Sequence, residues 1–290
     1  MSNYVIVTDS CCDLPAAMIE EMGLSVICLS VLVDGKTYTN HPDWREISAK
    51  DFYDLMRAEK TASTSAASMG NVMEVMEPLL QAGKDVLYLG FSSALSSTYS
   101  TAVLAAGELM EQYPNRKVLC VDTLCASLGQ GLFVRLVWEK QQAGASLEEA
   151  YAFARDLVHN LCHWFTVNDL HALQRGGRVS KTTAVVGSIL HIKPVLHVDG
   201  EGRLTKLGTV RGRKASLAAL KDRLKETITN PEEQTIYISH GDCEAEARLL
   251  ADMIAAEVPV KGFVFNPVGP VIGAHTGAGV IALFNVGSPR

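Results

Sequence analysis

The 290-residue sequence contains few charged residues and lacks the common nucleotide and hydrolase motifs. Only 20% of its residues are charged whereas 48% are apolar, a composition that excludes a disordered chain. It has no GxxxxGK[ST] loop and no GxGxxG motif after a predicted strand, so the standard means of binding a pyrophosphate are missing. The GxSxG elbow of α/β-hydrolases is missing as well. The composition therefore indicates a globular protein without a standard nucleotide site.

Positive charge is also scarce, and the cysteines are scattered. The formal net charge is −6, which argues against nucleic acid as a partner because a phosphate backbone attracts basic surfaces. The seven cysteines include no CxxC pair, so a structural zinc site is not expected and no metal or cofactor is predicted. Reduced thiols and the lack of a signal-peptide pattern favour a cytoplasmic protein. Two windows without Asp, Glu, Lys or Arg, 86–107 and 265–289, are too polar or too interrupted to predict membrane spans.

The first half of the chain alternates strand-like and helix-like segments. Strands are predicted at 4–8, 24–33, 85–91 and 117–122, and helices at 48–58, 71–81, 96–112, 126–142 and 147–160. An Asp34-Gly35 pair predicts a hairpin, and a capping box beginning at Ser146 marks a helix start. Alternating strands and helices indicate βαβ units and a parallel sheet. We therefore predict an N-terminal α/β/α domain over residues 1–162.

The pattern changes after residue 162. A strand at 162–167 precedes two β-rich runs, 194–198 and 203–210, which flank the turn at 199–202 and predict an antiparallel hairpin. Helices near 212–228 and 243–257, a strand at 235–239 and glycine-rich strands up to the C-terminus follow. We predict a C-terminal α/β domain over residues 163–290 with a mixed or antiparallel sheet.

Small polar residues gather at the ends of three predicted strands, at 8–10, 92–93 and 122–123. Because ligands of open α/β sheets bind beyond the carboxyl ends of the strands, these residues mark a candidate site. Two Ser/Thr clusters, at 61–68 and 92–98, each precede a predicted helix, where free N–H groups and hydroxyls suit a carboxylate or phosphate. Ordinary N-capping would explain either cluster equally well.

Other polar residues remain open to two interpretations. Arg178 follows a tight Gly-Gly turn that could direct its guanidinium inward, although a solvated loop arginine is the simpler alternative. His275 lies in a glycine-rich segment and could be either a functional or a structural histidine. Cys12 lies next to Asp13, which would raise the pKa of its thiol and favours a structural role.

Seven short segments together resemble the DegV family of bacterial fatty-acid-binding proteins. They occur in the family's order over nearly the whole chain: TDSCCDLP at 8–15, TS at 64–65 with Ser68, SSALSSTY at 92–99, DT at 122–123 with Ser127 and Gly129, GGRVS at 176–180, KP at 193–194, and GPVIGAHTG at 269–277. No single segment is decisive, but the ordered set is specific.

The resemblance implies a non-catalytic carrier that binds a long-chain fatty acid, such as palmitate, stearate or oleate, in a tunnel between two domains. By motif position, Thr64 with the adjacent Ser65, and Ser96, would hold the carboxylate, while Arg178 and His275 would complete the polar network. The family delivers the acyl chain to a fatty acid kinase, and Arg211 would dock that partner. Contact with a membrane would be only transient.

The sequence departs from the family pattern at three positions. Ala66 and Ala67 stand where Gln-Pro is common, and Ser97 stands where glycine is common. These changes leave the preferred acyl chain length open.

Two other function classes remain as alternatives. One is a small hydrolase or phosphotransfer enzyme that uses Asp9, His275 or Cys12. The other is an interaction module that binds no small molecule.

Overall fold

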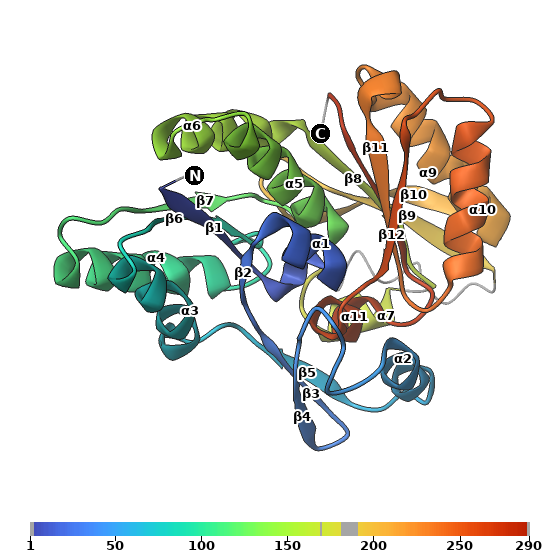
Figure 1. Cartoon of the computed structure of the whole chain (residues 1–290). Helices are drawn as coiled ribbons and strands as arrows, with labels where there is room; N and C mark the ends of the chain where they lie inside the picture. The colour runs from blue at the N-terminus through green and yellow to red at the C-terminus, as the bar shows by residue number, and fades with distance from the viewer. Residues whose placement is uncertain (1–2, 169, 181–190, 289–290) are drawn as a thin grey trace.

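The structure is a computed structural model that describes residues 3–168, 170–180 and 191–288 (Figure 1). Its first half contains a fully parallel sheet with the strand order β2-β1-β6-β7. The bounds of these strands are β1 (Tyr4–Asp9), β2 (Ser25–Ile27), β6 (Asp85–Gly90) and β7 (Val118–Asp122). The prediction of a parallel N-terminal sheet is confirmed.

Helices cover both faces of the parallel sheet because its strands bury side chains on both sides. Val7 and Tyr88 pack against α3 and α4, whereas Ile6 and Leu87 belong to the core beneath α5 and α6. The helices of this half are α1 (Ala16–Met22), α2 (Ala49–Arg57), α3 (Met69–Gln81), α4 (Thr98–Gln112), α5 (Leu128–Gln142) and α6 (Leu147–Leu157). Capping boxes that start at Ser68 and Ser146 begin α3 and α6.

The second half contains a six-stranded mixed sheet with the order β10-β9-β8-β13-β11-β12. Only β11 and β12 pair in parallel, and the hairpin predicted around residues 199–202 is confirmed as β9 and β10. The strands are β8 (Leu161–Thr166), β9 (Ile192–Val198), β10 (Leu204–Arg211), β11 (Thr235–His240), β12 (Gly262–Pro267) and β13 (Ile281–Val286). The helices are α7 (His171–Arg175), α9 (Arg213–Thr227), α10 (Glu244–Ala255) and α11 (Pro270–Thr276).

The two sheets confirm the predicted fold class, an α/β protein with a parallel sheet followed by a mixed sheet. The predicted division after residue 162 falls inside β8, and the exact domain limits stay a prediction. Of the helices in the described ranges, none has the length and apolarity needed to cross a bilayer.

Two sequence predictions were wrong in detail. The predicted strand at 24–33 is two strands, because the chain leaves the parallel sheet at Leu29, whose N–H donates to the Ser10 hydroxyl. The second, β3 (Ser30–Val33), joins β4 (Lys36–Thr39) and β5 (Ala62–Ser65) in a small antiparallel sheet that the sequence did not predict. Residues 270–276 form α11 rather than a strand, since Pro270 occupies its first position, where a missing N–H costs nothing.

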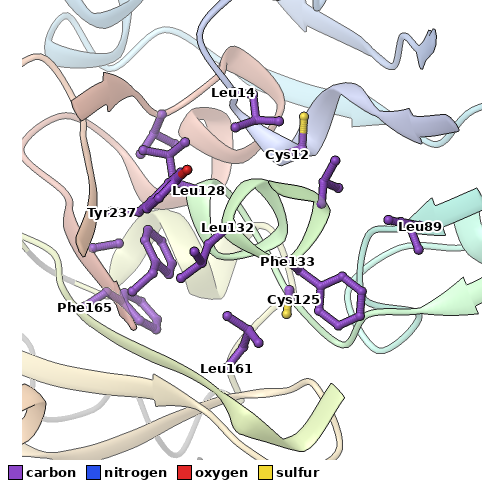
Figure 2. Packing of buried hydrophobic residues seen from close by; sticks show 14 of the residues in the cluster. Cys12, Leu14, Leu89, Cys125, Leu128, Leu132, Phe133, Leu161, Phe165 and Tyr237 are labelled. Atoms are coloured by element: carbon purple, nitrogen blue, oxygen red, sulfur yellow. The ribbon is translucent and has the colours of Figure 1, made fainter. Parts of the chain in front are cut away.

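Helix α5 lies between the two large sheets and packs closely against both. Gly129 faces the mixed sheet, where an added Cβ would lie 2.2 Å from His163 Nε2. Gly131 faces the other way, and its Cβ would lie 2.8 Å from the Cys12 carbonyl oxygen. Figure 2 shows the same helix placing Leu128, Leu132 and Phe133 among side chains of both halves, with Leu14, Phe165 and Tyr237 around them. One core therefore spans the two halves of the chain.

We expect Gly131→Ala to lower the free energy of unfolding by about 1–3 kcal/mol, because the new methyl group meets backbone that cannot rotate away. Gly107→Ala in α4 is the matched control, since a Cβ there has no neighbour within 4 Å. That control should gain up to about 1 kcal/mol from helix propensity. Urea unfolding of both variants measures the difference, and equal effects would show that α5 is not closely packed.

Candidate functional site

A cavity of about 300 Å³ lies between the two large sheets. Apolar side chains from both halves line most of it, among them Leu95, Phe91, Phe165, Val271 and Phe284. Its volume is at the lower end of the range for small-molecule sites. Four polar side chains of the lining, Thr64, Ser96, Arg178 and His275, lie near one another, since Thr64 bonds to His275 and Arg178 bonds to the carbonyl of the residue before Ser96. The cavity can thus take a ligand with an apolar body and one polar end.

Thr64 and His275 form a hydrogen bond across the two halves of the chain. Thr64 comes from β5, His275 comes from α11, and their Oγ1 and Nε2 atoms are 2.9 Å apart. His275 Nδ1 is buried and has no hydrogen-bond partner among the described residues. An N–H there would be left unpaired, so the tautomer with the proton on Nε2 is favoured. His275 then donates to Thr64, and the Thr64 hydroxyl proton is free for a ligand.

Ser96 supplies a second hydroxyl at the same end. Its Oγ accepts a hydrogen bond from the Thr98 N–H at 3.2 Å and lies 2.9 Å from Thr98 Oγ1. Thr98 Oγ1 also accepts from the Ala67 N–H. With Thr98 as donor to Ser96, the Ser96 proton is free to donate into the cavity.

Arg178 brings a positive charge to these hydroxyls. Its Nε and Nη2 atoms donate to the Leu95 carbonyl at 3.2 and 3.1 Å, and Nη1 donates to the Gly176 carbonyl. The other two of the five guanidinium N–H groups have no partner among the residues that the structure describes. Within the described part of the chain no carboxylate pairs with Arg178. A half-buried cation without a counter-ion favours binding of an anion.

His275 contributes to this site as a neutral group. Burial, assisted by the nearby Arg178, lowers the pKa of His275 to about 4. The ring packs against Gly176, where an added Cβ would lie 2.0 Å from Nδ1, so only glycine fits beside it. The Gly-Gly-Arg sequence therefore serves two purposes, because it makes room for His275 and places Arg178.

A second cavity of about 560 Å³ adjoins the same polar residues. Thr64, Arg178 and His275 line both cavities, and Lys60 and Arg175 line only the second. A group held by Thr64 and Arg178 would thus be approached from two sides, with its apolar part in the first cavity.

The structure brings together all five residues predicted to bind the ligand, since Ser65 also lines the first cavity. Arg211 lies elsewhere, exposed at the end of β10. Sequence reasoning assigned no ligand contact to the other polar residues of the lining, which are Ser97, Ser127, His163, Ser239 and Thr276. Ser239 is near the carboxyl end of a strand, which was the one usable signal, but the search for polar strand ends covered only the strands of the first half.

The residues proposed for catalysis are not grouped with one another in this cavity. Asp9 is buried, and its carboxylate accepts from Tyr88 OH and from the Phe91 and Cys11 N–H groups. Cys12 is buried too, and burial raises the pKa of its thiol far above the usual range. Neither residue lines the cavity that contains His275. In the described ranges no three His, Cys, Asp or Glu side chains are arranged to hold a metal ion.

We expect His275 to make the folded protein less stable in acid. Between pH 6.5 and 4 the unfolded chain protonates this histidine while the folded chain does not, so the free energy of unfolding falls as pH falls through that window. His275→Gln should flatten this part of the pH dependence, whereas replacing the exposed His159 by Gln should preserve it. Urea unfolding at pH 7, 6 and 5 tests this, and parallel curves for His275→Gln and wild type would contradict it.

Comparisons with known proteins show which family and which solved structures the chain resembles. A sequence model described as "Uncharacterised protein, DegV family" matches residues 3–287. A DegV domain-containing protein of Clostridium perfringens is 41% identical over 290 residues, 100% of this chain and 99% of that protein. A DegV lipid-binding protein from Thermotoga maritima has a solved structure with a TM-score of 0.86 and 29% identity over 100% of both chains.

A third relative is a solved structure whose description names fatty acid binding. The structure of a DegV family protein from Thermus thermophilus, reported for fatty acid binding, has a TM-score of 0.86 and 31% identity over 98% of this chain and 99% of that one. The fold, the ordered motifs and these matches extend over essentially the whole sequence. The chain belongs to the DegV family.

Proposed function

We propose that this protein binds one long-chain fatty acid, such as palmitate, stearate or oleate, in the cavity between its two sheets. The single observation that supports this most is Arg178, a half-buried cation without a described counter-ion, set beside two hydroxyl donors at one end of an apolar cavity. A carboxylate would accept from Thr64, Ser96 and the free N–H groups of Arg178. The fatty-acid-binding description of the Thermus thermophilus relative supports the same ligand class.

The energetics suit a tail that provides affinity and a head group that provides orientation. Burying about 15 methylene groups contributes roughly 12 kcal/mol before the entropic costs of binding. The carboxylate loses its hydration on entry, and the charged hydrogen bonds at the polar end offset that cost. The tail would therefore lie among the apolar side chains and the carboxylate beside Arg178.

We further propose that the protein is a non-catalytic carrier that presents the carboxylate to a fatty acid kinase for acyl-phosphate formation. The second cavity supports this, because it reaches Thr64, Arg178 and His275 from the side away from the acyl chain. Arg211, exposed on β10, is the candidate residue for docking the kinase.

The cysteines suit a protein of the cytoplasm. None of the seven is in a disulfide, and in that compartment the thiols would stay reduced. Only a transient membrane contact would be needed to load the ligand.

Native mass spectrometry of the purified protein should show one bound fatty acid per chain, because a cavity this apolar would retain a ligand from the producing cell. Delipidated protein should bind added palmitate or oleate with one-to-one stoichiometry in a calorimeter. Protein that is empty as purified and that also ignores both acids would refute the carrier function and would favour the interaction module.

Replacing both head-group hydroxyls, Thr64→Val with Ser96→Ala, should weaken palmitate binding by at least about tenfold. Each substitution removes a hydrogen bond to a charged group, and the volume of the side chain changes little. The matched control is Ser93→Ala, since Ser93 is exposed in the same Ser/Thr cluster and does not line the cavity. Equal affinities for the double variant and the control would place the carboxylate elsewhere.

A further inference from the structure

The strand β5 has an open edge that faces the second cavity. It is an outer strand of the small antiparallel sheet, and among the described strands it pairs only with β3. Residues 61–64, which are the residue before β5 and its first three residues, line the second cavity of about 560 Å³. An edge strand presents unpaired N–H and C=O groups, which the backbone of another chain can use. The second cavity is therefore a place where a further strand could bind.

The hydrogen-bond pattern shows which backbone groups of β5 point away from β3. The Asp34 N–H donates to the Thr61 carbonyl at 3.1 Å, so these two residues form a hydrogen-bonded pair. In an antiparallel ladder such pairs alternate with pairs that are not hydrogen-bonded. The register therefore places the N–H and C=O groups of Ala62 and Thr64 on the open edge. Within the described ranges, none of these four groups has a hydrogen-bond partner.

β5 lacks the features that usually protect an edge strand. Its sequence, Ala-Ser-Thr-Ser at 62–65, contains no charged residue and no proline, and its register with β3 is continuous, without a bulge. Natural edge strands are commonly blocked by such residues or by bulges. An unprotected edge is typical of proteins that bind an extended segment of a partner by strand addition.

The rest of the cavity lining leaves room for such a segment. Small residues from α7 and α11, together with the glycines that directly follow these helices, contribute to it: Ala172, Gly176, Ala274 and Gly277. A strand added to β5 would lie about 4.8 Å from it. It would therefore meet short side chains on this side of the cavity rather than bulky ones.

The charge of the lining favours an acidic segment. Three cationic side chains line the second cavity, Lys60, Arg175 and Arg178, and Glu59 is the one acidic residue of its described lining. Lys60 already pairs with Asp34, and Arg178 would hold the fatty acid carboxylate. Arg175 is exposed and has no partner among the described residues. In a chain of net charge −6, this cavity is thus a local site for a carboxylate.

An extended backbone fits the edge better than a lipid phosphate does. The edge presents N–H donors and C=O acceptors in alternation, and the oxygens of a phosphodiester only accept hydrogen bonds. A phosphodiester would therefore leave the Ala62 and Thr64 carbonyls unpaired, whereas another strand pairs with both kinds of group.

We propose that the open edge of β5 binds an extended acidic segment of a partner protein as an additional strand, with a carboxylate of that segment beside Arg175. The added strand would run past Thr64, so the partner would lie next to the head-group residues. This docking mode goes beyond fatty acid binding and does not require it. Only the identification of the partner with the proposed kinase rests on the proposed function.

A designed peptide tests the edge, titrated in a calorimeter into the full-length protein with and without palmitate. The probe is a short, acetylated and amidated peptide of alternating threonine and valine with a central glutamate, and a second peptide carries lysine instead. The glutamate peptide should bind at least roughly fivefold more tightly than the lysine peptide. Arg175→Glu should abolish that preference, whereas Arg155→Glu on the exposed surface of α6 should preserve it.

Ala62→Pro tests the addition of a strand. The Ala62 N–H faces the cavity, so proline removes a donor from the open edge without removing a hydrogen bond to β3. This variant should bind neither peptide, whereas Ala62→Ser, which keeps the N–H, should bind as wild type does. Palmitate affinity should stay within about twofold in both variants. Thermal unfolding shows that each variant is folded before titration.

Hydrogen exchange of the wild-type protein gives a readout that needs no variant. Without peptide, the amides of Ala62 and Thr64 should exchange faster than the amide of Ser63, which faces β3. A saturating amount of the glutamate peptide should slow exchange at Ala62 and Thr64 by at least roughly tenfold.

The outcomes separate this proposal from the proposed function. No binding of the glutamate peptide at about 1 mM, or binding that leaves exchange at Ala62 and Thr64 unchanged, overturns the docking edge. Equal affinity for the two peptides overturns the acidic partner. Neither result affects the fatty acid site, which the palmitate titration decides. Peptide binding by a protein that ignores palmitate would support the docking edge and refute the fatty acid site.

Discussion

The close packing of α5 between two sheets is the constraint on which the rest of the structure depends. Gly129 and Gly131, two residues apart, let the helix approach the mixed sheet on one side and the backbone after β1 on the other. A helix covered on both faces cannot shift toward one sheet without losing contact with the other. The distance between the sheets is therefore fixed, and with it the cavity that side chains of both halves line. Figure 1 shows α5 between the parallel sheet and the mixed sheet.

The proposed head-group site consists of residues from segments that are far apart in the sequence. Thr64 and Ser96 come from the first half, and Arg178 and His275 come from the second. Two of them depend on a neighbour: Gly176 leaves room for the His275 ring, and Thr98 Oγ1 lies 2.9 Å from Ser96 Oγ. Burial, assisted by the charge of Arg178, keeps His275 neutral, so the site presents one cation rather than two.

The sequence predicted those elements whose pattern is local. The buried strands β1 and β6, the capping box at Ser146 and the hairpin around residues 199–202 each carry a signal within a few residues, and each is found as expected. The head-group residues came from family motifs rather than from periodicity. The break between β2 and β3 could not be predicted, because it depends on Ser10, which is 19 residues from Leu29. Ser239 was missed for a similar reason, since only the register of β11 shows that it faces the cavity.

Several hydrogen bonds that join the two halves also surround the ligand space. Arg178 donates to the Leu95 carbonyl, Thr64 pairs with His275, and Ser92 donates to the Gly202 carbonyl at 2.9 Å. If the proposed acyl chain is bound between the halves, it would leave only when contacts of this kind open together, and its residence time would depend on the opening rate of the protein as well as on its affinity. A carrier built in this way would protect its cargo from exchange with other lipids during transit, and a partner that loosens those bonds would control the moment of release.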